Sequence, residues 1–312
     1  MSFGHRFLAE PDLFPARPSG EAWGREALVL DLAGGPYRFR GLSAAQAAVV
    51  AERFAGRLLP EGTPAAVEAA VFRAAPADFL TFDTRGWEYA LDTDFAPASV
   101  RLSGLFLSAR LDWRPDLAGA LWTADGGEER FAGIFENFFR VLSAYRLLEV
   151  GGVILHCAGV LHGGRAFLFL GRSGAGKSTL SRLAEERGGT VLSDDMNALA
   201  LDGDRAAVAA LPFTGDLGDR RRPHSTFPLA ALMRLEKSAD DALRPLSRAE
   251  AVAALFTAAP FVNADPHRRD ALFLNLARLA RAADEEGGAA AWALRFSLGG
   301  GFWSILDRKW PI

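Results

Sequence analysis

This chain of 312 residues has few cysteines and few lysines: one cysteine, Cys157, and three lysines beside 32 arginines. A single cysteine excludes a disulfide within the chain, and with it the small secreted domains that disulfides hold together. We therefore expect a reducing compartment, the cytoplasm. Because the composition otherwise favours arginine, the few positions that keep a lysine are informative.

Long hydrophobic runs and a strong charge are also absent. No stretch approaches the roughly 18 uncharged apolar residues of a membrane-spanning helix, and the opening segment MSFGHRFLAEPDLF lacks the apolar core of a signal peptide. The formal net charge of −3 gives no reason to expect binding to nucleic acid or to an anionic membrane. Half of the residues are hydrophobic, so a globular core can form.

One of the three lysines is Lys177, in the segment Gly171-Arg-Ser-Gly-Ala-Gly-Lys-Ser178. This is the G-x-x-x-x-G-K-[ST] pattern of a phosphate-binding loop, whose backbone N–H groups surround nucleotide phosphates. A lysine ammonium is a compact charge on a flexible stem, and it reaches between the β- and γ-phosphates better than a planar guanidinium does. The pattern predicts binding of ATP or another nucleoside triphosphate; the alternative is a flexible Gly/Ser loop.

Each residue type in this loop suits a task at a triphosphate. Lys177 would hold the β- and γ-phosphates, and the hydroxyl of Ser178 would bind Mg²⁺. The glycines supply turns that a side chain would obstruct. The candidate nucleotide-binding residues are Gly171, Ser173, Gly174, Ala175, Gly176, Lys177, Ser178 and Thr179.

Two adjacent carboxylates follow the loop at a short interval. The helix after the loop ends at Gly188-Gly189, and a second strand, residues 190–193, should return parallel to the strand before the loop. Its end, with Asp194 and Asp195, then lies beside the phosphates. One carboxylate can hold Mg²⁺ and the other can accept a proton from an attacking hydroxyl. The alternative is a simple Asp-Asp turn.

A β-hairpin is predicted before the loop, from residues 152–161 and 165–170 joined by a turn that contains His162. If the residues beside the turn pair, His156 lies opposite Leu170, one residue before the loop. A shift of one residue would move the histidine to the other face of the sheet. His156 is therefore a candidate catalytic residue, with a core histidine as the alternative, and His162 is expected to be exposed.

The N-terminal part reads as an α+β domain that shows no catalytic constellation. Alternation predicts strands at residues 27–32 and 37–40, a helix at 43–58 and aromatic-rich strands at 78–113. This part could recognise a substrate or brace the other domain.

We place the domain boundary between residues 130 and 131, so that the domains are 1–130 and 131–312. Residues 131–148 predict an amphipathic helix whose aromatic stripe faces the core. Glu136 and Arg140 are expected on its solvated side. Downstream of the two carboxylates, residues 211–224 read as a polar loop, either a lid or simply solvated.

The order of His156, the phosphate loop, a short helix and Asp194-Asp195 resembles the C-terminal catalytic domain of HPr kinase/phosphorylase, a P-loop kinase domain related to phosphoenolpyruvate carboxykinase. It also resembles the broader HPr-kinase-like proteins, some of which phosphorylate a serine on lasso precursor peptides. The resemblance is strongest over residues 151–196. It implies an α/β kinase domain of this type joined to an N-terminal α+β domain of a different kind.

The resemblance also implies roles. Asp194 matches the general base toward the acceptor hydroxyl, Asp195 a magnesium ligand, and His156 the histidine of the site. Lys177 and Ser178 match phosphate and metal contacts. Hexamers occur in the related family, so a homo-oligomer is possible.

The sequence also departs from the family pattern. Cys157 stands where the family has glycine after the histidine, and Thr179 where it has glutamate after G-K-S. Residues 214–216 replace the downstream Glu-x-Arg-Gly motif, so neither the reverse phosphorylase reaction nor HPr as substrate is implied.

Together these features predict a Mg²⁺-dependent cytoplasmic kinase that transfers the γ-phosphoryl of ATP to a hydroxyl, in the first instance a serine of a peptide or protein. One alternative is a nucleotide-binding switch or assembly module that transfers nothing. Another is a small-molecule kinase, which a closed acceptor pocket would favour.

Overall fold

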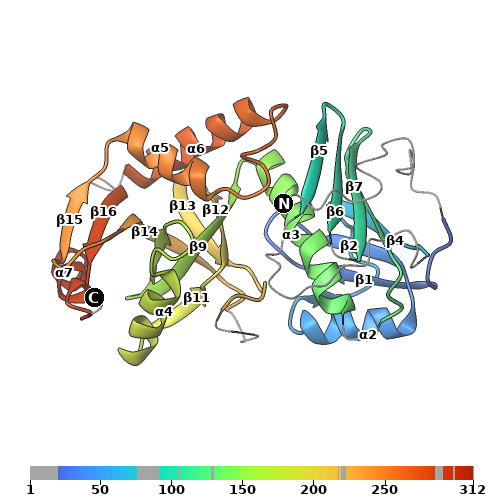
Figure 1. The fold of residues 1–312 in the computed structure, drawn as a ribbon, viewed down its shortest axis with the longest axis horizontal. Helices are drawn as coiled ribbons and strands as arrows, with labels where there is room; N and C mark the ends of the chain where they lie inside the picture. The colour runs from blue at the N-terminus through green and yellow to red at the C-terminus, as the bar shows by residue number, and fades with distance from the viewer. Residues whose placement is uncertain are drawn as a thin grey trace. The chain divides into compact units, whose positions relative to one another are not determined.

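The computed structural model describes residues 20–75, 91–104, 106–127, 130–216, 218, 223–284, 291–297 and 299–311. The chain divides into two compact units, Met1–Arg146 and Leu147–Ile312. Both combine a large sheet with a few helices (Figure 1), so the fold is α+β, as the sequence predicts. Part of the segment expected to form aromatic-rich strands, residues 78–90, and residues 217 and 219–222 of the polar loop lie outside the described residues.

The first unit is built on one eight-stranded sheet in the order β3-β1-β2-β4-β8-β7-β6-β5, with parallel pairing only at β2–β4 and β4–β8. Its elements are β1 (Glu26–Leu30), β2 (Tyr37–Leu42), α2 (Ala44–Arg53), β3 (Leu58–Leu59), β4 (Val67–Arg73), β5 (Asp92–Ala96), β6 (Ser99–Gly104), β7 (Leu107–Trp113), β8 (Leu117–Thr123) and α3 (Phe131–Glu149).

The aromatic stripe of α3 is core, as predicted. Phe39 on β2 has its ring centroid 4.6 Å from that of Phe135 and 5.0 Å from that of Phe139, both in edge-on geometry. Such contacts add to the stabilisation from burying the rings. The predicted domain boundary falls at the start of α3, whereas the two units divide near its end.

The polar side of α3 is not solvated, which makes that prediction wrong. Glu136 is only 5% exposed. Its Oε2 atom lies 2.6 Å from Nη2 of Arg53 on α2, and its Oε1 atom lies 2.7 Å from Nη2 of Arg140 one turn along α3. A charged residue at a buried position needs such partners, and here they join α3 to α2.

The second unit is built on a sheet with the strand order β10-β9-β12-β13-β14-β16-β15. Its elements are β9 (Val153–His162), β10 (Arg165–Leu170), α4 (Lys177–Glu186), β11 (Thr190–Ser193), β12 (Met196–Asp202), β13 (Arg205–Ala210), β14 (Thr226–Lys237), β15 (Ala242–Pro245), α5 (Arg248–Ala258), α6 (Arg269–Asp284), β16 (Ala291–Phe296) and α7 (Phe302–Lys309).

The long strand β14 closes this sheet on itself. Its residues 226–228 pair antiparallel with β13, and its residues 229–234 pair parallel with β10. Helices α4 and α7 share an apolar core with the sheet, and α5 and α6 pack on each other along its other side (Figure 1). The phosphate loop thus leaves a strand held on both edges, by β9 and by β14.

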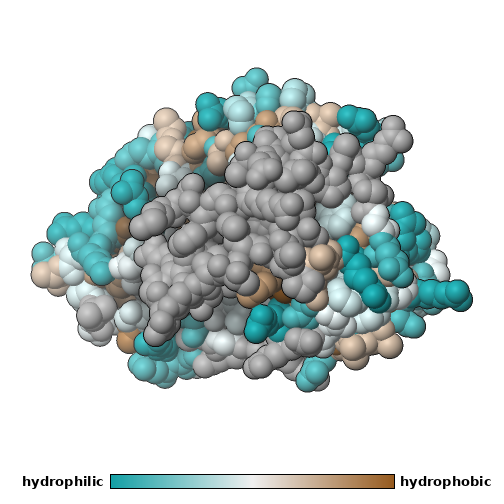
Figure 2. Space-filling model, turned by 45° about the vertical axis from the view of Figure 1, so that its right-hand side comes forward, coloured by the Kyte–Doolittle hydropathy of each residue, from teal (hydrophilic) through white to brown (hydrophobic). Residues whose placement is uncertain are grey.

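The described surface carries few large apolar side chains. Those that are exposed are Leu58, Val150, Phe273 and Leu274. On the face shown in Figure 2, hydrophilic and apolar residues are interspersed. None of the described helices combines the length and the apolar character needed to cross a lipid bilayer.

Candidate functional site

The β9–β10 hairpin differs by one residue from the predicted register. Its turn is the two-residue Gly163-Gly164, with φ angles of 56° and 73°, which glycine adopts without strain. His162 is therefore a strand residue paired with Arg165 rather than part of the turn. Cys157, not His156, lies opposite Leu170.

The corrected register leaves His156 just beyond the end of β10. It pairs with Met196 on the other edge of β9 and lines the same pocket as Gly171, the first residue of the loop. His162 is not simply exposed either: its Nε2 atom lies 2.9 Å from Oδ1 of Asp307 on α7.

The two aspartates interrupt what is otherwise one strand. β11 pairs antiparallel with the second half of β9, and β12 pairs antiparallel with its first half. Between them Asp194 and Asp195 form a break, where the N–H of Cys157 donates to the carbonyl oxygen of Asp195 at 3.0 Å. β10 and β11 therefore run in the same direction, as predicted, although β9 separates them.

Buried polar side chains hold this break in place. Asn197 is fully buried, and its Nδ2 atom donates to the carbonyl oxygens of Cys157 at 2.9 Å and Ser193 at 3.3 Å. The hydroxyl of Ser193 accepts from the N–H of Met196 at 3.1 Å. Gly159 makes room for the amide, since a Cβ there would lie 2.5 Å from Oδ1 of Asn197.

The phosphate loop joins β10 to α4 as the sequence pattern requires. Gly174 and Gly176 have φ angles of 74° and 102°, and Gly176 is the residue that precedes α4. A Cβ on Gly171 would lie 2.6 Å from that of Ala175. Three of the glycines therefore serve turns or close contacts, and the loop's N–H groups precede the positive end of a helix dipole.

Within this loop Lys177 is buried, and its Nζ atom donates to the carbonyl oxygen of Gly171 at 2.9 Å. Burial lowers the pKa of its ammonium, and the negative charges of Asp195 and Asp216 oppose that effect. Ser173 and Gly174 are exposed, and Thr179 lies half-buried in the first turn of α4.

Asp216 is a site residue that the sequence did not single out. Its Oδ2 atom accepts a hydrogen bond from the Ser178 hydroxyl at 2.5 Å. It lies 38 positions further along the chain, in the segment read either as a lid or as a solvated loop. No local pattern links it to the phosphate loop; only the Thr-Gly-Asp sequence in place of the Glu-x-Arg-Gly motif pointed to this region.

The adjacent aspartates have different surroundings. Oδ1 of Asp195 lies 3.7 Å from Nε2 of His156, and their side chains are 16% and 45% exposed. Asp194 is only 4% exposed and faces Gly215, where a Cβ would lie 2.5 Å from Oδ1 of Asp194. Asp195 therefore faces His156 and Lys177, while Asp194 packs against the segment that carries Asp216.

The oxygen atoms at this position fit a magnesium ion bound together with phosphates. Among the described residues, no group of three or more His, Cys, Asp or Glu side chains could hold a metal alone. Mg²⁺ needs fewer protein ligands, because it keeps several waters and binds substrate phosphates. Ser178, Asp216 and one of the two adjacent aspartates would supply the hard oxygen ligands it prefers.

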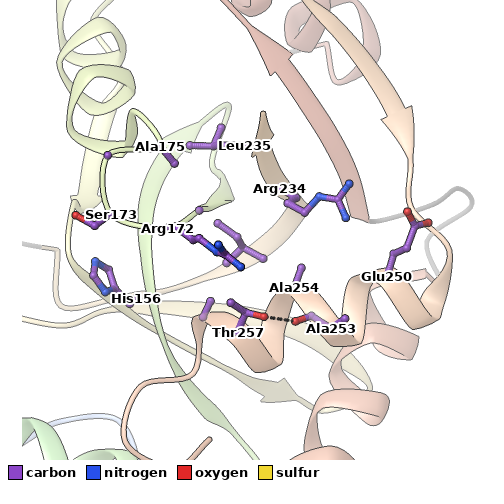
Figure 3. Close-up of a pocket in the computed structure, with 14 residues that line it drawn as sticks. His156, Arg172, Ser173, Ala175, Arg234, Leu235, Glu250, Ala253, Ala254 and Thr257 are labelled. Carbon is purple, nitrogen blue, oxygen red and sulfur yellow. Dashed lines mark hydrogen bonds between the residues drawn. The ribbon is translucent and has the colours of Figure 1, made fainter. Parts of the chain in front are cut away.

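A pocket of about 620 Å³ opens beside the loop, within the second unit (Figure 3). One wall is the loop and His156, the opposite wall is α5, and the end of β14 lies between them. Its lining comprises His156, Leu170, Gly171, Arg172, Ser173, Gly174, Ala175, Arg234, Leu235, Glu250, Ala253, Ala254, Thr257 and Ala258.

Fold and site together define a two-unit α+β protein in which a glycine-rich loop, set between a strand and a helix, faces a cluster of carboxylates. The chain belongs to the family described as SynChlorMet cassette protein ScmC, whose family model matches residues 134–310, more than half of the chain. The match includes every residue of the candidate site. No curated protein matches the chain.

Proposed function

We propose that this protein is a Mg²⁺-nucleotide-dependent kinase that transfers the γ-phosphoryl of ATP to a hydroxyl, most favourably a serine of a peptide or protein. The observation that carries the proposal is that Asp216 accepts a hydrogen bond from Ser178, while the charges of both Asp216 and Asp195 act on Lys177. Carboxylates beside a phosphate loop supply the metal ligand and the proton acceptor that phosphoryl transfer to a hydroxyl requires.

Nucleotide binding would use the loop and the start of α4. Backbone N–H groups of the loop surround the phosphates, and Lys177 moves from its carbonyl partners to the β- and γ-phosphates. Ser178, Asp216 and one of the two adjacent aspartates would hold Mg²⁺, which neutralises phosphate charge when bound. The resemblance to HPr-kinase-like proteins supports this arrangement.

In the transfer, the acceptor oxygen forms a bond to the γ-phosphorus while the bond to the bridging β–γ oxygen breaks, and the nucleoside diphosphate leaves. The acceptor proton passes to a carboxylate. The resemblance to HPr-kinase-like proteins implies that Asp194 accepts the proton and that Asp195 binds the metal. Burial favours the reverse, since a base must touch the acceptor and Asp195 is the more exposed of the two.

Labelled ATP and the single variants Asp194→Asn, Asp195→Asn and Asp216→Asn test the proposal. Loss of the base should lower transfer by about 10²–10⁴-fold with ATP affinity nearly unchanged. Loss of a metal ligand should weaken ATP binding in Mg²⁺ but not in EDTA, which binding titrations measure directly. We expect Asp216→Asn to show the metal behaviour.

The same variants separate the proposal from a nucleotide-binding switch. A switch would keep its nucleotide response in the base variant and would yield no phosphorylated product. The kinase assignment fails if the wild-type protein binds Mg²⁺-ATP but labels no acceptor in a lysate of its source organism.

A further inference from the structure

We propose that the pocket beside the phosphate loop is the acceptor subsite, and that it binds a short apolar stretch of peptide next to the hydroxyl that is phosphorylated. This inference rests on the proposed kinase activity and specifies its substrate class. It follows from the position of the pocket, the chemistry of its walls, and its size and openness.

The pocket adjoins the place where the phosphates would lie and extends from it toward α5. It is lined by residues 171–175 of the loop and by His156, but not by Lys177 or Ser178, the residues suited to the triphosphate and its metal. His156 in turn lies 3.7 Å from Asp195, measured from Nε2 to Oδ1. One end of the pocket therefore meets the carboxylates at which the acceptor hydroxyl must arrive.

The wall formed by α5 is largely carbon. Ala253, Ala254 and Ala258 line it, and the Thr257 hydroxyl between them donates to the Ala253 carbonyl oxygen at 2.9 Å (Figure 3). A nucleobase is recognised by hydrogen bonds to its edges as well as by apolar contacts with its faces, and this wall could supply only the apolar contacts. Apolar side chains of a peptide would bury their surface against it favourably.

The charged residues that line the pocket are Arg172 on the loop, Arg234 on β14 and Glu250 at the start of α5. Figure 3 shows Arg172 reaching into the pocket from the loop, where a guanidinium can meet the phosphoryl group being transferred. At the far end, Glu250 has its Oε1 atom 3.0 Å from Nη2 of Arg244, and Arg234 has its Nη2 atom 2.6 Å from Oε1 of Glu236. Glu250 and Arg234 are therefore each paired with a neighbouring charge, and Arg172 is directed into the pocket beside the alanines of α5.

The pocket is too large and too open for a free hydroxy amino acid. Its volume of about 620 Å³ lies in the middle of the range for drug-sized ligands. Several lining residues are exposed, among them Ser173 and Gly174 on the loop and Ala253 and Thr257 on α5. A chain can therefore enter and leave along this side, which favours a peptide over an enclosed metabolite.

Filling the pocket from α5 tests the assignment on the full chain. Ala253→Phe places a ring in the pocket from an exposed position, so the core is not overpacked. Ala249→Phe is the matched control, because Ala249 is exposed on the same helix and does not line the pocket. The probes are Mg²⁺-ATP in equilibrium dialysis and a degenerate peptide library with a fixed central serine, labelled from ATP.

We expect wild-type protein to label the library and to select apolar residues beside the serine. Ala253→Phe should bind ATP within about twofold of wild type and lose about tenfold or more of the labelling, as expected for a blocked apolar subsite. Ala249→Phe should match wild type in both measurements.

Other outcomes overturn the inference in distinguishable ways. Weaker ATP binding by Ala253→Phe would place the nucleoside in this pocket. Labelling of free serine or homoserine but not of peptides would make the acceptor a small molecule, and equal labelling by Ala253→Phe would place the acceptor elsewhere. If wild type binds no Mg²⁺-ATP, the proposed function itself fails.

Discussion

At the scale of single residues, Cys157 is the residue of the site whose pKa departs most from its ordinary value. It is fully buried between the loop strand and the aspartates, and burial raises its pKa from 9.0 to about 12 despite the nearby charge of Lys177. Only the thiolate is a strong nucleophile, so this thiol is protonated and inert at neutral pH. Its place beside the site reflects packing rather than catalysis.

We predict that native protein shows no thiol reactive toward Ellman's reagent at pH 8, and one after denaturation. Because the folded pKa exceeds the unfolded value, Cys157 contributes fully to stability below about pH 9 and loses that contribution between about pH 9 and 12. Urea unfolding across this range should show a steeper loss for wild type than for Cys157→Ala. Parallel pH profiles for the two proteins would contradict the assignment.

Residues of the site were predictable where their pattern is local. The spacing of glycines around Lys177 predicts the turns of the loop, because these turns are set within eight consecutive residues. Phosphate binding by the loop stays a prediction. The predicted pairing of His156 with Leu170 is wrong by one residue. The Gly-Gly pair makes a two-residue turn, so His162 belongs to the strand. Asp216 could not be predicted, because its contact with Ser178 depends on how distant segments pack.

At the scale of elements, helix α3 shows that a charged residue in an amphipathic pattern does not have to lie on the exposed side. Most of its circumference is buried, including Glu136, which has Arg53 and Arg140 within salt-bridge distance. A local cap gives a clearer signal: Ser43 and Ser247 each form a complete capping box at the start of α2 and α5. A cap lies within four residues, whereas the partner of a buried charge can come from anywhere in the chain.

We predict that Glu136→Gln destabilises the first unit by about 3 kcal/mol, because it leaves two arginines without their buried counter-charge. Urea unfolding followed by tryptophan fluorescence measures the change. The control is Glu52→Gln, an exposed position on α2, which should change stability by less than about 0.5 kcal/mol. Equal effects of the two substitutions would mean that the buried pair adds nothing specific.

At the scale of the whole molecule, the α+β class follows from composition and alternation, but the path of the second sheet does not. Its closure depends on β14 pairing with both β13 and β10, strands that are far apart in the sequence. Because β10 is paired with β9 on one edge and with β14 on the other, the loop that follows it starts from a strand held on both sides. We therefore expect ligand binding to change the loop and its immediate surroundings rather than the sheet.

We therefore predict that Mg²⁺-ATP slows amide hydrogen exchange in the loop and around Asp194 and Asp195, and leaves the sheet of the first unit unchanged. All residues that line the pocket, and all candidate ligands of the phosphates and metal, belong to the second unit. ATP at about 100 times its Kd should stabilise that unit by about 2.7 kcal/mol. Lys177→Ala is the control and should abolish the protection. Equal slowing in β6 and β7 would show that the nucleotide acts on both units, and that the site extends beyond the residues assigned to it.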